Sequence, residues 1–113
     1  MSDDNEAAMK FQQLSQKLQQ ISMQKNSTET EKQEIEKALR ELDKSEDEDV
    51  YKSVGSILVS KDYDELKEEL EERHETLEVR LKSLEKKEKK MREKVQESQK
   101  QFAQQMQGQN MAK

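Results

Sequence analysis

The sequence predicts a mainly α-helical fold: a long antiparallel two-helix coiled coil with one β-hairpin at the connecting end. Two long segments, 6–43 and 62–107, repeat apolar residues at spacings of three and four, which is the pattern of a coiled-coil stripe. A single short β-like segment, 50–61, separates them. With 42% charged and 29% hydrophobic residues, the chain has too little apolar material for a compact core, which favours long exposed helices in one domain, 1–113.

The first helix is expected at about 6–43, after a frayed start, and the acidic segment 44–49 is expected to form a loop. Seven of its ten stripe positions are apolar, and the three polar ones are consecutive and central. There a lysine stem can lie along the stripe while its ammonium reaches water, so we expect looser packing. The positions are Phe11, Leu14, Leu18, Ile21, Lys25, Thr28, Lys32, Ile35, Leu39 and Leu42.

The segment 50–61, V-Y-K-S-V-G-S-I-L-V-S-K, predicts a β-hairpin. Gly55-Ser56 suits a two-residue type II′ turn, and the resulting pairs are Val54 with Ile57, Lys52 with Val59, and Val50 with Lys61. Apolar residues lie on both faces, and an isolated hairpin is marginal in water. We therefore expect hairpins of several subunits to pair with one another, through Val50, Tyr51, Val54, Ile57, Leu58 and Val59.

The second helix is expected at about 62–107, with Asp62 as N-cap and Glu65 three residues later. Gly108 marks its expected end, and 108–113 is expected to be a disordered tail. Its stripe is Tyr63, Leu66, Leu70, Arg73 or His74, Leu77, Leu81, Leu84, Glu88, Met91, Val95, Ser98 and Phe102. A short hairpin makes the helices antiparallel, and the expected pairs are Leu42 with Leu66, Leu39 with Leu70, Leu18 with Met91, and Leu14 with Val95.

Candidate chemistry is sparse, and we expect neither an enzyme nor a bound cofactor or metal. His74 is the only histidine, and with Glu71, Glu75 and Glu78 in helical reach it fits a stripe or surface histidine better than a metal ligand. No Gly-rich phosphate loop is present, and the fold offers paired carboxylates no pocket. The net charge of −5 argues against a nucleic-acid or membrane-surface binder. The absence of cysteine and the polar acidic start favour a cytoplasmic protein.

Two further features allow functional readings. The run Lys86–Lys94 is interpreted as a solvated helix face interleaved with glutamates, and its alternative is a patch for an acidic partner or nucleic acid. Methionine suits promiscuous apolar binding, and five methionines lie in the outer portions of the helices. The candidate binding residues at the free helix ends are Met9, Phe11, Leu14, Val95, Phe102 and Met106.

The run V-Y-K-S-V-G-S-I-L-V at Val50–Val59, set alone between two heptad helices, resembles the beta-class prefoldin subunits. The resemblance covers nearly the whole chain; one departure is Ser56, where many relatives have Pro. It implies a hexamer of alpha-class and beta-class subunits whose hairpins form a double β-barrel. It also implies an ATP-independent cytosolic chaperone that holds unfolded chains, such as actin and tubulin, and passes them to a group II chaperonin.

Two other functions stay open. One is a non-chaperone structural or adaptor coiled coil, although a plain stalk has no use for an apolar β-ribbon in mid-chain. The other is a nucleic-acid-binding coiled coil, which the net charge and the small number of aromatic residues disfavour.

Overall fold

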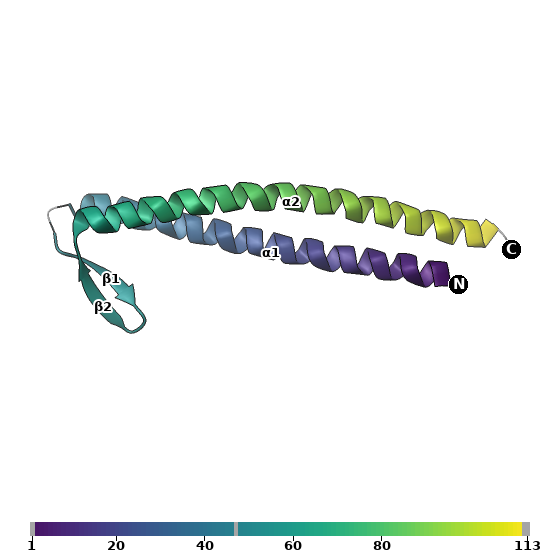
Figure 1. Ribbon diagram of the computed structural model, residues 1–113, viewed down its shortest axis with the longest axis horizontal. Helices are drawn as coiled ribbons and strands as arrows, with labels where there is room; N and C mark the ends of the chain where they lie inside the picture. Colours follow the sequence, from purple (N-terminus) through teal and green to yellow (C-terminus); the bar gives the residue numbers. More distant parts are fainter. Residues whose placement is uncertain (1, 47, 112–113) are drawn as a thin grey trace. The chain divides into compact units, whose positions relative to one another are not determined.

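The computed structural model describes residues 2–46 and 48–111, with side chains for 5–46 and 48–107. The elements follow in the predicted order: α1 (Ser2–Lys44), β1 (Val50–Val54), β2 (Ile57–Lys61) and α2 (Tyr63–Met111), as Figure 1 shows. Two compact units divide the chain. Ser27–Leu81 forms the hairpin unit, and Met1–Asn26 with Lys82–Lys113 forms the terminal unit.

Both helices are longer than the sequence predicted. α1 begins at Ser2 and not near residue 6, because residues 2–44 contain no Pro or Gly that would stop a helix. α2 continues to Met111, so the predicted disordered tail is wrong for residues 108–111, while residues 112–113 lie outside the described part of the chain. One Gly inside a helix costs only about 1 kcal/mol relative to Ala, and Gly108 remains helical.

The predicted stripe is the covered face of each helix. Every predicted stripe position is buried or half-buried once the choice between Arg73 and His74 is settled: His74 is half-buried and Arg73 is exposed. Leu77 is the most buried side chain, at 1% exposure. Three polar stripe positions are as covered as the leucines, namely Thr28, Glu88 and Ser98.

An apolar cluster joins helices and hairpin within the hairpin unit. Leu42, Val50 and Leu66 are its buried members, and Tyr63 and Leu70 pack against it. Leu42 and Leu66 therefore meet as the antiparallel register predicted. Full burial of one such side chain is worth about 1.5–3 kcal/mol, so this cluster is the main apolar tie between the hairpin and the helix pair.

The hairpin has the predicted register. Val50 pairs with Lys61, Lys52 with Val59, and Val54 with Ile57. Gly55 has a φ of 60°, and no described non-glycine residue has a positive φ. A type I′ turn needs positive φ at both central residues whereas type II′ needs it only at the first, so the turn is the predicted type II′.

The start of α2 is capped as predicted. The backbone N–H of Glu65 donates a hydrogen bond to Oδ2 of Asp62 at 3.2 Å, and the N–H of Leu66 donates to the Asp62 carbonyl oxygen at 2.9 Å. This N-cap satisfies one of the donors that a helix start leaves unpaired. Asp62 therefore fixes where strand β2 ends and α2 begins.

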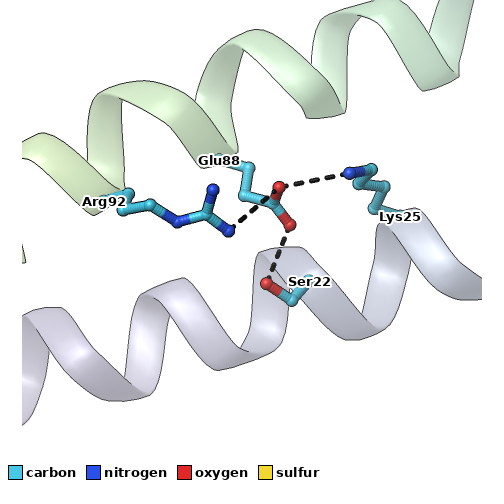
Figure 2. Close-up of polar contacts among 4 residues, drawn as sticks. All are labelled: Ser22, Lys25, Glu88 and Arg92. Atoms are coloured by element: carbon cyan, nitrogen blue, oxygen red, sulfur yellow. Dashed lines mark hydrogen bonds and ion pairs between the residues drawn. The ribbon is translucent and has the colours of Figure 1, made fainter.

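A carboxylate occupies the stripe in the terminal unit (Figure 2). Ser22 Oγ donates a hydrogen bond to Glu88 Oε2 at 2.9 Å, and Lys25 Nζ donates to Oε1 at 3.2 Å. Arg92 Nη2, one turn along α2, lies 3.4 Å from Oε1. The hydrogen bonds from Ser22 and then from Lys25 hold the pKa of Glu88 below its ordinary value. Where the sequence predicted looser packing, the structure has a specific charge-assisted network.

Candidate functional site

Most of the hairpin's apolar side chains lie on the protein surface. Tyr51, Val54, Ile57 and Leu58 are between 50% and 71% exposed, and Val59 is 36% exposed. The register places Val54, Ile57 and Val59 on one face of the ribbon and Tyr51 and Leu58 on the other. Both faces of the hairpin therefore offer apolar surface that this chain does not cover.

Val50 is an exception among the predicted assembly residues. Its side chain is only 9% exposed and packs in the cluster with Leu42 and Leu66. The sequence could not show this, because the alternation along the strand says nothing about which end of the ribbon touches the helices. Val50 therefore anchors the hairpin within its own subunit and leaves five candidate residues for contacts between subunits.

In the part of the chain that the structure describes, no further strand pairs with either edge of the two-stranded sheet. In a two-residue hairpin the closing pair, Val54 and Ile57, exchanges both backbone hydrogen bonds, and hydrogen-bonded pairs then alternate along the ladder. The backbone N–H and C=O groups of Tyr51 and Ser53 on β1, and of Leu58 and Ser60 on β2, therefore point away from the partner strand. Such edges can each accept a further strand.

A salt bridge holds the hairpin against α2. The ammonium of Lys52 in β1 donates a hydrogen bond to the carboxylate of Glu69. This hydrogen bond is the main cause of the lowered pKa of Glu69. The contact ties the hairpin to the first turns of α2. It therefore helps to hold the two strands and their unpaired edges in place.

The candidate binding residues at the helix ends fall into two classes. Met9 and Met106 are 58% and 46% exposed, whereas Phe11, Leu14, Val95 and Phe102 are half-buried on the stripe. Leu14 also lines a surface groove of about 330 Å³, with Lys10, Lys94, Glu97, Ser98 and Gln101. The structure thus brings only Leu14 of the six into that groove. Of the groove's charged residues, Lys94 belongs to the run Lys86–Lys94, whose alternative interpretation was a binding patch, whereas Lys10 and Glu97 were not named from the sequence.

Two comparisons with known proteins identify the family. The family model described as "Prefoldin subunit" matches residues 5–109. The chain is also similar to the crystal structure of the prefoldin beta subunit from Thermococcus strain KS-1, with 37% identity, a TM-score of 0.77, and 90% of each chain covered. The chain belongs to the prefoldin family, in its beta class. No curated protein sequence matches it.

Membership of this family indicates the general function of the chain. Prefoldins are chaperones and not a family of enzymes, and they assemble as hexamers, so this prefoldin subunit is a chaperone component that joins other subunits. Within the described residues, neither helix has an apolar stretch that would cross a bilayer. No group of three or more metal-ligating side chains lies together in the same residues.

His74 of this prefoldin subunit lies between two glutamates, one on each helix. Its Nε2 lies 3.0 Å from Glu36 Oε1, and its Nδ1 lies 3.3 Å from Glu78 Oε1. The hydrogen bond with His74 is the main reason that the pKa of Glu36 is lowered. Sequence reasoning named Glu78 but missed Glu36. The antiparallel register, in which paired residue numbers sum to about 110, was the signal that would have found it.

Proposed function

We propose that this chain is a subunit of a cytoplasmic prefoldin hexamer that holds unfolded proteins without ATP and delivers them to a group II chaperonin. In this proposal alpha-class and further beta-class subunits complete the hexamer. The observation that carries it is the exposure of five apolar hairpin residues on both faces of a two-stranded ribbon with open edges. Such a ribbon is stabilised when other strands and apolar faces cover it.

The assembly role predicts that a charge on the hairpin breaks the complex. Val54→Asp and Ile57→Asp, alone and together, place a carboxylate on exposed apolar surface. Val79→Asp is the matched control, because Val79 is 65% exposed but lies on α2 in the same unit. Native mass after mixing with candidate alpha-class subunits should fall for the hairpin variants only, while helicity by circular dichroism stays near wild type. An intact complex carrying both hairpin substitutions would refute the platform role.

The holding role places unfolded clients at the helix ends. The motivating observation is that Met9 and Met106 are exposed, while Phe11, Leu14, Val95 and Phe102 are half-buried. Full burial of one apolar side chain is worth about 1.5–3 kcal/mol, so one subunit binds weakly and several acting together hold firmly.

Phe102→Ser with Met106→Ser tests that placement. Met23→Ser is the control, because Met23 is 61% exposed in the same unit but is not a candidate binding residue. The assembled complex should keep its mass, and its suppression of aggregation of a denatured model protein should weaken several-fold for the double variant alone. The same suppression should be equal with and without ATP. Full assembly with no capture in the wild type would instead support a structural adaptor.

A further inference from the structure

The two units carry opposite net charges. The hairpin unit has 19 Asp and Glu against 9 Lys and Arg, a net charge of −10. The terminal unit has 12 Lys and Arg against 7 Asp and Glu, a net charge of +5. The overall charge of −5 therefore hides a basic unit that contains the candidate client-binding residues.

The basic residues of that unit form a defined feature on α2. Lys82, Lys86, Lys90 and Lys94 follow one another at intervals of four residues, and all four are exposed. We call them the lysine row. Among the described side chains, no carboxylate lies within 4.0 Å of any of the four ammonium groups. Their charge is thus not neutralised by any carboxylate that the structure describes.

The lysine row leads into the groove beside Leu14. Four residues are slightly more than one helical turn, so the row winds slowly around α2 over about 18 Å. It begins on the side of α2 opposite the stripe and reaches the flank of the stripe at Lys94. Lys94 and Lys10 both line the groove that contains Leu14, and they outnumber its one lining carboxylate, Glu97. An apolar side chain seated beside Leu14 would therefore bring the rest of its segment close to several free ammonium groups.

We infer that the terminal unit selects acidic segments of unfolded polypeptides, with an apolar client residue against Leu14 and client carboxylates along the lysine row. This inference rests on the proposed holding function and names its substrate class. Charge complementarity favours an acidic polypeptide, and the continuity of the row with the Leu14 groove favours a client over a second copy of this chain. Exposed charge pairs are screened by salt, so the selection is strongest at low ionic strength.

The test uses the assembled complex and two fluorescently labelled unstructured peptides. The peptides share one apolar sequence; the acidic peptide carries Glu at the positions where the neutral peptide carries Gln. The row variant carries Lys82→Gln, Lys86→Gln, Lys90→Gln and Lys94→Gln. The control variant removes four exposed cations that have no ion pair within the described residues, through Lys17→Gln, Lys37→Gln, Arg40→Gln and Arg80→Gln.

The wild-type complex should bind the acidic peptide more tightly than the neutral one, and added salt should remove the difference. The affinity of the row variant for the acidic peptide should fall about tenfold, and that of the control variant by less than about twofold. Both variants should bind the neutral peptide with wild-type affinity. Equal binding of both peptides by wild type and row variant overturns the inference and leaves the holding function standing. Failure of wild type to bind either peptide defeats the holding function itself.

Two further outcomes assign the lysine row to another partner. Loss of the oligomer by the row variant in light scattering would make the row a contact between subunits, which overturns the inference. Tighter binding of a single-stranded oligonucleotide than of the acidic peptide, abolished in the row variant, would make it a nucleic-acid site and overturn the inference as well.

Discussion

The hairpin unit and the terminal unit have the same two-helix arrangement but differ in what their stripes bury and in how their basic residues are paired. In the hairpin unit the stripe packs into an apolar cluster, and bases are paired with carboxylates of the same unit: Lys32, Lys44, Lys52, Lys67 and Arg73. In the terminal unit the stripe includes a buried carboxylate. Among the side chains described there, Lys25 and Arg92 are the basic ones with ion pairs, and both contact this carboxylate. The hairpin unit thus pairs more than half of its basic side chains with its own carboxylates, whereas most basic side chains described in the terminal unit have no such ion pair.

The largest loss of stability should come from the hairpin unit's buried stripe. Leu77→Ala removes the most buried side chain, at 1% exposure, and should lower the free energy of unfolding by about 2–5 kcal/mol. Urea unfolding of the purified chain, followed by circular dichroism, measures this loss. Val79→Ala, two residues away and exposed, should change stability by less than about 0.5 kcal/mol. Equal effects of the two substitutions would contradict the assignment of the stripe.

The terminal unit should respond in an unusual way to changes at Glu88. Glu88→Gln keeps the shape of the side chain but removes the negative charge to which Lys25 and Ser22 donate hydrogen bonds. It should lower the free energy of unfolding by about 1–3 kcal/mol. Glu88→Leu should be neutral or stabilising, because a buried ionic contact is often no better than apolar packing. The two variants are compared by thermal unfolding. A larger loss for Leu than for Gln would show that the network contributes net stability.

The Glu88 network should matter more for register than for stability. The chain has no cysteine, so Leu18→Cys with Met91→Cys, placed at a pair that the heptad register predicts, reports that register through a disulfide. Cross-linking should be complete in the otherwise wild-type chain and incomplete when Glu88→Leu is added, because slipped pairings no longer bury a charge. Complete cross-linking in both chains would remove the register role.

Low pH should remove the difference in melting temperature between the wild type and Glu88→Gln. The pKa of Glu88 is lowered in the folded chain from its ordinary 4.5, so its contribution is full above that value and is lost as pH falls through the folded pKa. The gap in melting temperature at about pH 7 should therefore narrow below pH 4.5. Glu93→Gln, which removes an exposed carboxylate from the same unit, should show little gap at any pH.

The smallest effect should come from an exposed ion pair of the hairpin unit. Nε and Nη2 of Arg73 both donate to Glu31 Oε1, at 2.9 and 2.6 Å. Exposed pairs are worth about 0.2–1 kcal/mol and are screened by salt. Arg73→Gln should therefore lower stability slightly in dilute buffer and not at all in about 1 M salt. A loss that persists in high salt would mean that Arg73 also contributes apolar packing.

The sequence was sufficient for the fold because each element left a local pattern. The heptad spacing marked the stripe, Gly55 set the turn and register, and Asp62 marked the start of α2. The start of α1 and the end of α2 were predicted wrongly, because no Pro stops either helix there and the single Gly near the end of α2 is tolerated inside the helix. The role of Val50 and the contact of His74 with Glu36 depend on which parts of distant segments touch, and a local pattern does not contain that information.

The candidate site was predicted unevenly for the same reason. Apolar residues in a polar chain are conspicuous, so Tyr51, Ile57 and Met106 could be named from the sequence, and their exposure fits surface roles. Lys86, Lys90 and Lys94 of the lysine row lie in the basic run Lys86–Lys94, whose interleaved glutamates favoured a solvated helix face over a patch for an acidic partner. Only the structure separates free ammonium groups from neutralised ones. The groove joins Lys94 of α2 to Lys10 and Leu14 of α1, and this proximity depends on how the two helices are aligned.

The separation in sequence between Ser22 and Glu88 has a consequence during synthesis. The two residues are 66 positions apart, and ribosomes add about 5–20 residues per second. The Ser22 hydroxyl therefore waits roughly 3–13 seconds for its acceptor to be made, whereas Leu42 waits a much shorter time for Leu66. During that interval the stripe of the emerging α1, from Phe11 to Ile21, has no intramolecular partner. A newly made chain is thus for some seconds itself an unfolded, apolar-exposing polypeptide, and the proposed holding function would make it a client of assembled copies of its own complex.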